Sequence, residues 1–171
     1  MNILYTCDDN YVWLMGISVI SLFENNRNID KLNIYLLGDK ISDKNKHILW
    51  TIAECYKRKV TIIDVPKIKI PKSVVSSRWP MSAFTRLYSG QLLPGEIKKI
   101  LYLDCDTIVT GSILELEELD VSDYVVYGVK DCISGLYKQN IGLQPKAQYI
   151  NAGVLLSLIH ISEPTRPLYI S

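Results

Sequence analysis

The chain has 171 residues, 48% of them hydrophobic and 22% charged, which is an ordinary composition for one globular domain with a substantial core. Its formal net charge of +1 excludes a strongly basic surface of the kind that draws a whole protein onto nucleic acid. No apolar stretch is long enough to span a bilayer, and no basic leader precedes one. We therefore expect a cytoplasmic protein with no nucleic-acid partner.

A broken basic stretch bears on membrane contact. It comprises residues 57–59 together with Lys67, Lys69 and Lys72. Apolar residues interrupt it, so a solvated face is the favoured interpretation. Contact with anionic lipid is the alternative, and it leaves open a peripheral position at the inner face of the membrane for the full-length parent. The four cysteines form no close pairs and are expected to be reduced and structural.

Apolar runs and turn residues predict the elements in chain order. Strands are expected at residues 3–6, 32–37, 60–65, 100–103, 125–129 and 149–155. Helices are expected at residues 12–23, 43–58 and 80–87, with Ser42 capping the second and Pro80 starting the third. The first helix is apolar on nearly all sides, which suits a helix between two layers. Residues 134–148 are expected to be irregular.

Strands that alternate with helices imply an α/β fold with a Rossmann-like, mostly parallel, doubly wound sheet. Such sheets bind ligands at the carboxyl ends of their strands. Two acidic clusters follow predicted strands in this way, Asp8-Asp9-Asn10 and Asp104-Cys105-Asp106. Both clusters are therefore candidates for a ligand site.

The second cluster predicts a divalent-cation site. If extended geometry continues through Cys105, the carboxylates of Asp104 and Asp106 point to one side. Such a pair suits Mn²⁺ or Mg²⁺, which keeps open positions for phosphate oxygens. Two solvated aspartates in a turn are the alternative, because short motifs match often by chance.

The first cluster has polar groups that can read a nucleoside. A carboxylate and an amide from Asp8 and Asn10 can bind a base edge, and the ring of Tyr11 can stack on it. An ordinary Asx-rich turn explains the same residues equally well.

Arg86 lies among apolar residues in a predicted helix, where a guanidinium is costly to bury unless an anion meets it. A diphosphate-sugar or one of the acidic residues could be that anion. A snorkelling arginine on a surface helix is the alternative.

The order of these motifs resembles the retaining glycosyltransferases of family 8. The matching segments are Asp8-Asp9-Asn10-Tyr11, Phe84-Thr85-Arg86-Leu87, Leu101-Tyr102-Leu103-Asp104-Cys105-Asp106 and Tyr149-Ile150-Asn151-Ala152-Gly153-Val154-Leu155. Each segment is short, but the ordered set is specific. The resemblance implies a GT-A fold and transfer of a hexose from a UDP-sugar to a glycan or lipopolysaccharide acceptor, with Mn²⁺ (or Mg²⁺) on the diphosphate.

The resemblance also implies residue roles. The nucleotide would be bound by Thr6, Asp8, Asn10 and Tyr11, and the sugar or diphosphate would be contacted by Arg86, Asp104 and Asn151. The metal would be held by Asp104 and Asp106, and Asp131 would lie near the acceptor. No catalytic nucleophile is identifiable in the chain.

The end of the chain departs from the family pattern. Family members continue further, with a histidine that completes the metal shell and a lysine for the diphosphate, and His160 does not replace that histidine. Residues 156–166 resemble the translation of a transposase adapter used in sequencing libraries. We therefore expect a nucleotide-sugar-binding part at residues 1–155, a non-native tail at 156–171, and no activity from the fragment. A genuine strand with a Pro-rich end is the alternative.

Two other functions fit part of the pattern. A haloacid dehalogenase-like phosphatase would use Asp104 as nucleophile and Asp106 as acid/base, but three predicted strands precede this pair and Ile108 is unusual there. A non-catalytic nucleotide-binding module is the third reading. Binding of UDP that ignores metal would favour it.

Overall fold

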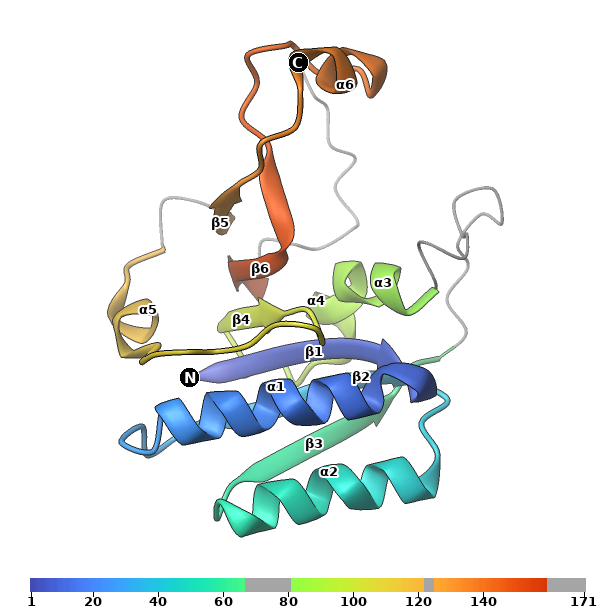
Figure 1. Ribbon diagram of the computed structural model, residues 1–171, viewed down its shortest axis with the longest axis vertical. Helices are drawn as coiled ribbons and strands as arrows, with labels where there is room; N and C mark the ends of the chain where they lie inside the picture. Colours follow the sequence, from blue (N-terminus) through green and yellow to red (C-terminus); the bar gives the residue numbers. More distant parts are fainter. Residues whose placement is uncertain (67–80, 122–124, 160–171) are drawn as a thin grey trace.

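A computed structural model describes residues 1–66, 81–121 and 125–159 of the chain. Its strands form one mixed sheet in the order β3-β2-β1-β4-β6-β5 (Figure 1). The strands are β1 (Asn2–Asp8), β2 (Asn33–Asp39), β3 (Lys59–Asp64), β4 (Lys99–Leu103), β5 (Val126–Lys130) and β6 (Ile150–Leu158). β1 to β4 are parallel, and β6 runs antiparallel to both of its neighbours. The predicted mostly parallel α/β sheet is confirmed.

The helices flank this sheet and project beyond it. They are α1 (Val12–Asn25), α2 (Asp43–Cys55), α3 (Met81–Thr85), α4 (Ser89–Leu92), α5 (Leu114–Glu118) and α6 (Gly135–Asn140), with 3₁₀ turns η1 (Asp9–Tyr11) and η2 (Arg86–Tyr88). In Figure 1, α1 and α2 run side by side along the parallel strands, whereas α6 lies at the far end of β5 and β6. No helix among the described residues is long and apolar enough to cross a membrane.

The side chains of β1 alternate between the two faces of the sheet, and each face has its own core cluster. Ile3 and Tyr5 are fully buried with Met15 of α1 in the larger core cluster. Leu4 points the other way and joins Leu93, after α4, in a smaller cluster. Because successive side chains of a strand point to opposite faces, one apolar run supplies both layers.

Four local predictions are wrong. α1 is covered on one side only, because Trp13 is 64% exposed and Ile17 is also exposed. The predicted helix at 43–58 ends at Cys55, and the predicted helix at 80–87 is divided into α3 and η2. The predicted irregular stretch contains α6, whose N-cap is Ser134. Its hydroxyl accepts a hydrogen bond from the Tyr137 amide (3.1 Å), the signal that the prediction missed.

β6 continues through Leu158, so residues 156–158 belong to the sheet. Leu156 pairs with Leu101 of β4 and is buried. The adapter origin of residues 156–171 stays a prediction, and residues 160–171, including His160, lie outside the described part of the chain.

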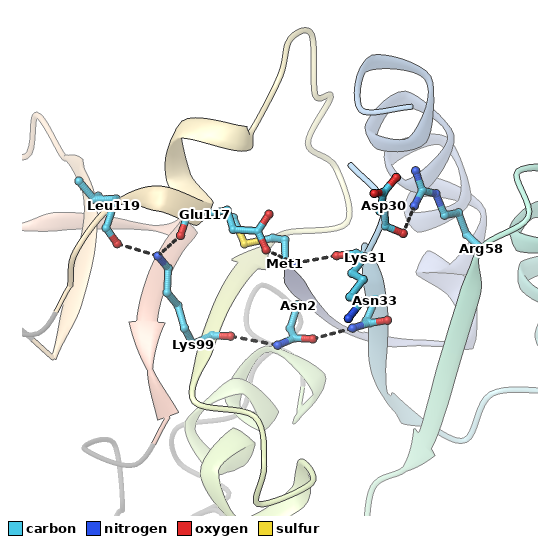
Figure 2. A network of polar contacts seen from close by, with 9 residues as sticks. All are labelled: Met1, Asn2, Asp30, Lys31, Asn33, Arg58, Lys99, Glu117 and Leu119. Carbon is cyan, nitrogen blue, oxygen red and sulfur yellow. Dashed lines mark hydrogen bonds and ion pairs between the residues drawn. The ribbon is translucent and has the colours of Figure 1, made fainter. Parts of the chain in front are cut away.

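Polar contacts join the strands at the amino edge of the sheet, opposite the predicted ligand edge (Figure 2). The side-chain Nδ2 of Asn33 donates to Asn2 Oδ1 (3.0 Å), and the side-chain Nδ2 of Asn2 donates to the carbonyl oxygen of Lys99 (3.4 Å). Lys99 Nζ donates to the carbonyl oxygens of Glu117 and Leu119 (2.7 Å each), which ties the segment after α5 to β4. The polar side chains at this edge therefore hold neighbouring segments of the fold together.

Candidate functional site

The loop that follows β1 holds the predicted nucleoside residues. Asp8 caps η1, with its Oδ1 accepting from the Asn10 amide (2.9 Å). Asn10 is exposed, and 47% of the Tyr11 side chain is accessible. The Asx turn is therefore present, and it is compatible with the predicted nucleoside contacts, because the cap orders the loop while Asn10 and Tyr11 stay exposed.

Asp9 has a different role from its neighbours. Its Oδ1 accepts hydrogen bonds from the backbone amide and hydroxyl of Ser42 (2.8 and 2.9 Å) and from the Asn45 amide group (2.8 Å). The bond from the Ser42 amide and those from the Asn45 and Ser42 side chains lower the pKa of Asp9 below its ordinary value. Asp9 therefore anchors the loop to the N-terminus of α2.

The acidic pair after β4 lies in a turn, not in an extended segment. β4 ends at Leu103, and the amide and hydroxyl of Thr107 both donate to the Asp104 carbonyl oxygen (3.2 and 2.8 Å). The premise that extended geometry continues through Cys105 is therefore wrong. The turn nevertheless buries Cys105, while Asp104 is half-buried and Asp106 is exposed.

Cys105 attaches this turn to β1. Its thiol donates to the Thr6 carbonyl oxygen (3.7 Å). A hydrogen bond with Cys7 and burial raise the pKa of Cys105, so it stays a thiol. Because β1 and β4 are adjacent parallel strands, the loop after β1 and the acidic turn lie at the same edge of the sheet.

Arg86 meets an acidic residue, as one of the alternatives predicted. Its Nη2 lies 3.3 Å from Asp104 Oδ1, and its Nη1 donates to the carbonyl oxygen of Ala152 in β6 (2.6 Å). The guanidinium carbon is also 4.4 Å from the centre of the Tyr102 ring. Arg86 therefore connects η2 to both β4 and β6, and it is not a snorkelling surface arginine.

The start of β6 completes this cluster. Gly153 donates its amide to Asn151 Oδ1 (2.8 Å), and its carbonyl oxygen accepts from the Asp104 amide (2.8 Å). A Cβ at Gly153 would lie 2.9 Å from Asp104 Oδ2 and 3.0 Å from Asn151 Oδ1. The Asn151 amide group lies 3.5 Å from Asp131 Oδ2, at the end of β5. Arg86, Asp104, Asn151 and Asp131 are thus brought together.

Sequence reasoning missed two residues of this cluster, Tyr102 and Gly153. Both stand in segments quoted for the family resemblance, and Tyr102 is two residues before Asp104, which is the available signal. Burial raises the pKa of Tyr102, so its hydroxyl keeps its proton. Among the described residues, no hydrogen bond or ion pair joins Asp106, Asn10 or Tyr11 to the cluster.

Carboxylate and amide oxygens at this edge suit a hard divalent cation. Asp104 Oδ2 lies beside Gly153, where an added Cβ would come within 2.9 Å of it, and Asp106 is exposed in the same turn. The two aspartates therefore fit the donor chemistry of a metal site. Across the described part of the chain, no group of three or more His, Cys, Asp or Glu side chains could enclose an ion by itself.

Of the basic stretch, residues 57–59 lie at the start of β3, at the opposite end of the parallel strands from the loop after β1. The Arg58 guanidinium donates to the carbonyl oxygens of Asp30 (2.8 Å) and Asn26 (3.3 Å), so it is committed to structure. Lys67, Lys69 and Lys72 lie outside the described residues.

The family model for glycosyl transferase family 8 matches residues 2–161. This chain belongs to that family. Among curated proteins, the chain is 28% identical over 159 residues to a lipopolysaccharide 1,2-glucosyltransferase of Escherichia coli, covering 91% of the chain and 46% of that protein. It is 26% identical over 157 residues to general stress protein A of Bacillus subtilis, covering 91% of the chain and 55% of that protein. The family-8 chain thus spans about half the length of these relatives.

Solved structures agree with this assignment. The galactosyltransferase LgtC, in complex with donor and acceptor sugar analogues, superimposes on the chain with a TM-score of 0.77 at 25% identity, covering 93% of the chain and 58% of LgtC. The fold is therefore the GT-A type found in that enzyme, as expected from the sequence. Family membership gives no support to the haloacid dehalogenase alternative.

Proposed function

We propose that the family-8 protein to which this chain belongs transfers a hexose from a UDP-sugar to a glycan or lipopolysaccharide acceptor, with retention at the anomeric carbon. The observation that carries this proposal is the convergence of two groups at one edge of the sheet. These are the capped loop after β1 and the cluster of Arg86, Asp104 and Asn151 beside it. The relatives named for lipopolysaccharide sugar transfer support the acceptor class.

In this proposal each group has a separate task. Thr6, Asp8 and Asn10 bind the nucleoside, and the exposed Tyr11 ring stacks on the base. Arg86 and Asn151 orient the sugar and the diphosphate. Asp131, next to Asn151, faces the acceptor.

Asp104 and Asp106 would hold the Mn²⁺ or Mg²⁺. When bound, the cation neutralises the negative charge that develops on the departing UDP. In the transfer, the bond from the anomeric carbon to the phosphate oxygen breaks and its electron pair leaves with UDP. A bond from the acceptor oxygen to the anomeric carbon forms while the acceptor hydroxyl gives its proton to the departing UDP oxygen. We also propose a cytoplasmic location, where nucleotide-sugars are available.

Titration of the ¹⁵N-labelled chain with UDP, with and without Mg²⁺, tests the proposal and detects even millimolar affinity. We expect shifts of the Asn10 and Tyr11 amides that strengthen with Mg²⁺. Asp106→Asn should remove this metal dependence, whereas Asp43→Asn, on the exposed first turn of α2, should keep it. Binding that ignores metal in the wild type would indicate the non-catalytic module, and absence of binding would contradict the nucleotide site.

A further inference from the structure

Tyr102 links the two halves of the proposed site. It lies in β4, is only 4% exposed, and packs in the smaller core cluster with Leu4 and Ile100. Its hydroxyl lies 2.6 Å from Asp104 Oδ1 and 3.3 Å from the hydroxyl of Thr6. The ring is therefore fixed by the core while its polar end reaches the ligand edge of the sheet.

The direction of these hydrogen bonds follows from the donors available. An ionised carboxylate can only accept, so the single proton of the Tyr102 hydroxyl is donated to Asp104. The Thr6 hydroxyl then donates to the Tyr102 oxygen. A directed chain runs from Thr6 through Tyr102 to Asp104 and connects a predicted nucleotide residue to a predicted metal ligand.

Two groups hold the same oxygen of Asp104. Besides Tyr102, the Nη2 of Arg86 lies 3.3 Å from Oδ1, and the guanidinium is positioned over the Tyr102 ring. The 2.6 Å bond from Tyr102 has the length of a strong charge-assisted hydrogen bond, and Arg86 adds an ion pair to the same oxygen. With Oδ1 held, Oδ2 is directed toward Gly153, whose lack of a side chain leaves this oxygen uncovered on that side.

We infer that Tyr102 is a positioning residue, which fixes the Asp104 carboxylate so that Oδ2 is presented to the divalent cation. The inference rests on the proposed function, because it assumes that Asp104 is a metal ligand. It assigns no role in bond making to Tyr102. Outer partners that orient a ligand typically contribute 10- to 100-fold to metal affinity.

Tyr102→Phe tests the inference, since it removes only the hydroxyl and keeps the ring beneath Arg86. Tyr56→Phe is a matched control, because the Tyr56 hydroxyl also donates to a carboxylate at 2.6 Å, that of Glu24, far from the site. Mn²⁺ is titrated into each UDP-saturated ¹⁵N-labelled chain, and the broadening of the Gly153 and Asp106 amides gives the midpoint. Urea unfolding of each variant measures the stability change separately.

We expect Tyr102→Phe to raise the Mn²⁺ midpoint about 10-fold or more, while Tyr56→Phe leaves it unchanged. An unchanged midpoint in a folded Tyr102→Phe chain would overturn the inference and leave the proposed function intact. A purely structural role would lower the urea midpoint without moving the Mn²⁺ midpoint, which also overturns it. No Mn²⁺-dependent broadening in the wild type would contradict the proposed metal site itself.

Discussion

Gly153 occupies a position where a methyl group has no room. An added Cβ would lie 2.9 Å from Asp104 Oδ2 and 3.0 Å from Asn151 Oδ1, so at least one of these side chains has to move. Both residues are predicted to contact the sugar or diphosphate of the UDP-sugar. The absence of a side chain at this residue is therefore part of the site.

Gly153→Ala should weaken metal-dependent UDP binding by about tenfold, or ~1.4 kcal/mol, because it displaces the Asp104 carboxylate. Gly111→Ala is the control, since an added Cβ there meets nothing within 4 Å. Calorimetry with UDP in the presence of Mg²⁺ measures both variants. Equal affinities for Gly153→Ala and Gly111→Ala would show that the space near Asp104 is not used.

Asp9 should make the free energy of unfolding depend on pH in the acid range. Its pKa is lowered from 3.8 in the folded chain by the hydrogen bonds from Ser42 and Asn45. A carboxylate with a lowered folded pKa contributes stability that is present above pH 3.8 and lost as the pH falls through the folded value. Urea midpoints measured from pH 7 down to pH 3 should therefore fall more steeply for the wild type than for Asp9→Asn.

The control for this pH series is Asp30→Asn, which replaces an exposed aspartate at the other end of the molecule. It should retain the steep acid dependence of the wild type. Identical slopes for Asp9→Asn and Asp30→Asn would contradict the anchoring role of Asp9.

Among the helices and strands, α2 shows how a local cap also serves the site. Ser42 accepts from the Asn45 amide (3.4 Å) and donates to Asp9 Oδ1 (2.9 Å). The start of α2 and the loop after β1 are therefore stabilised by the same residues. The sequence pattern predicted the cap correctly, whereas its contact with Asp9 needed the strand order β2-β1 to bring the two together.

Ser42→Ala should destabilise the chain by about 1 kcal/mol, the usual loss for an N-cap. Thr51→Ala, on the exposed middle of α2, should have a smaller effect, because its hydroxyl only bonds back to the His47 carbonyl oxygen. Urea unfolding curves with a common slope give both differences. A larger loss for Thr51→Ala would argue against the cap.

For the molecule as a whole, β6 joins the edge that carries the site to the core. Leu156 is 4% exposed in the larger core cluster and pairs with Leu101 of β4 and Tyr127 of β5. Further along the same strand, toward its start, Asn151 and Gly153 border Asp104. The register that buries Leu156 therefore also sets the position of the Asn151 side chain.

Leu156→Ala should cost about 2–5 kcal/mol of unfolding free energy, as expected for a leucine removed from a core. Leu136→Ala in α6 is the matched control, because Leu136 is 69% exposed. Thermal or urea unfolding separates the two. Equal stabilities would mean that residues 156–158 contribute little to the folded sheet, as expected if the adapter-like tail is foreign to it.

The elements that sequence patterns predicted best are those with dense apolar periodicity. β1, β2, β3 and β4 were placed within two residues at their boundaries, because buried parallel strands appear as continuous apolar runs. α5 and α6 were missed, since each is a short polar helix whose formation depends on caps and packing more than on periodicity. The exposed side of α1 was missed because composition does not show which neighbours cover a helix.

The motifs at the strand ends were enough to name Asp8, Asn10 and Asp104, since polar residues after apolar strands stand out in any α/β pattern. Arg86 was named because it stands among apolar residues in a predicted helix, and Asn151 only through the family resemblance. The sequence did not show which group each of these side chains, or its neighbour in the chain, contacts. That Asp9 bonds to Ser42, that Arg86 pairs with Asp104, and that Arg86 also bonds to Ala152 all depend on distances between segments 18 to 66 residues apart in the chain. Such contacts form only when the sheet is assembled, because strand order and register decide which side chains meet.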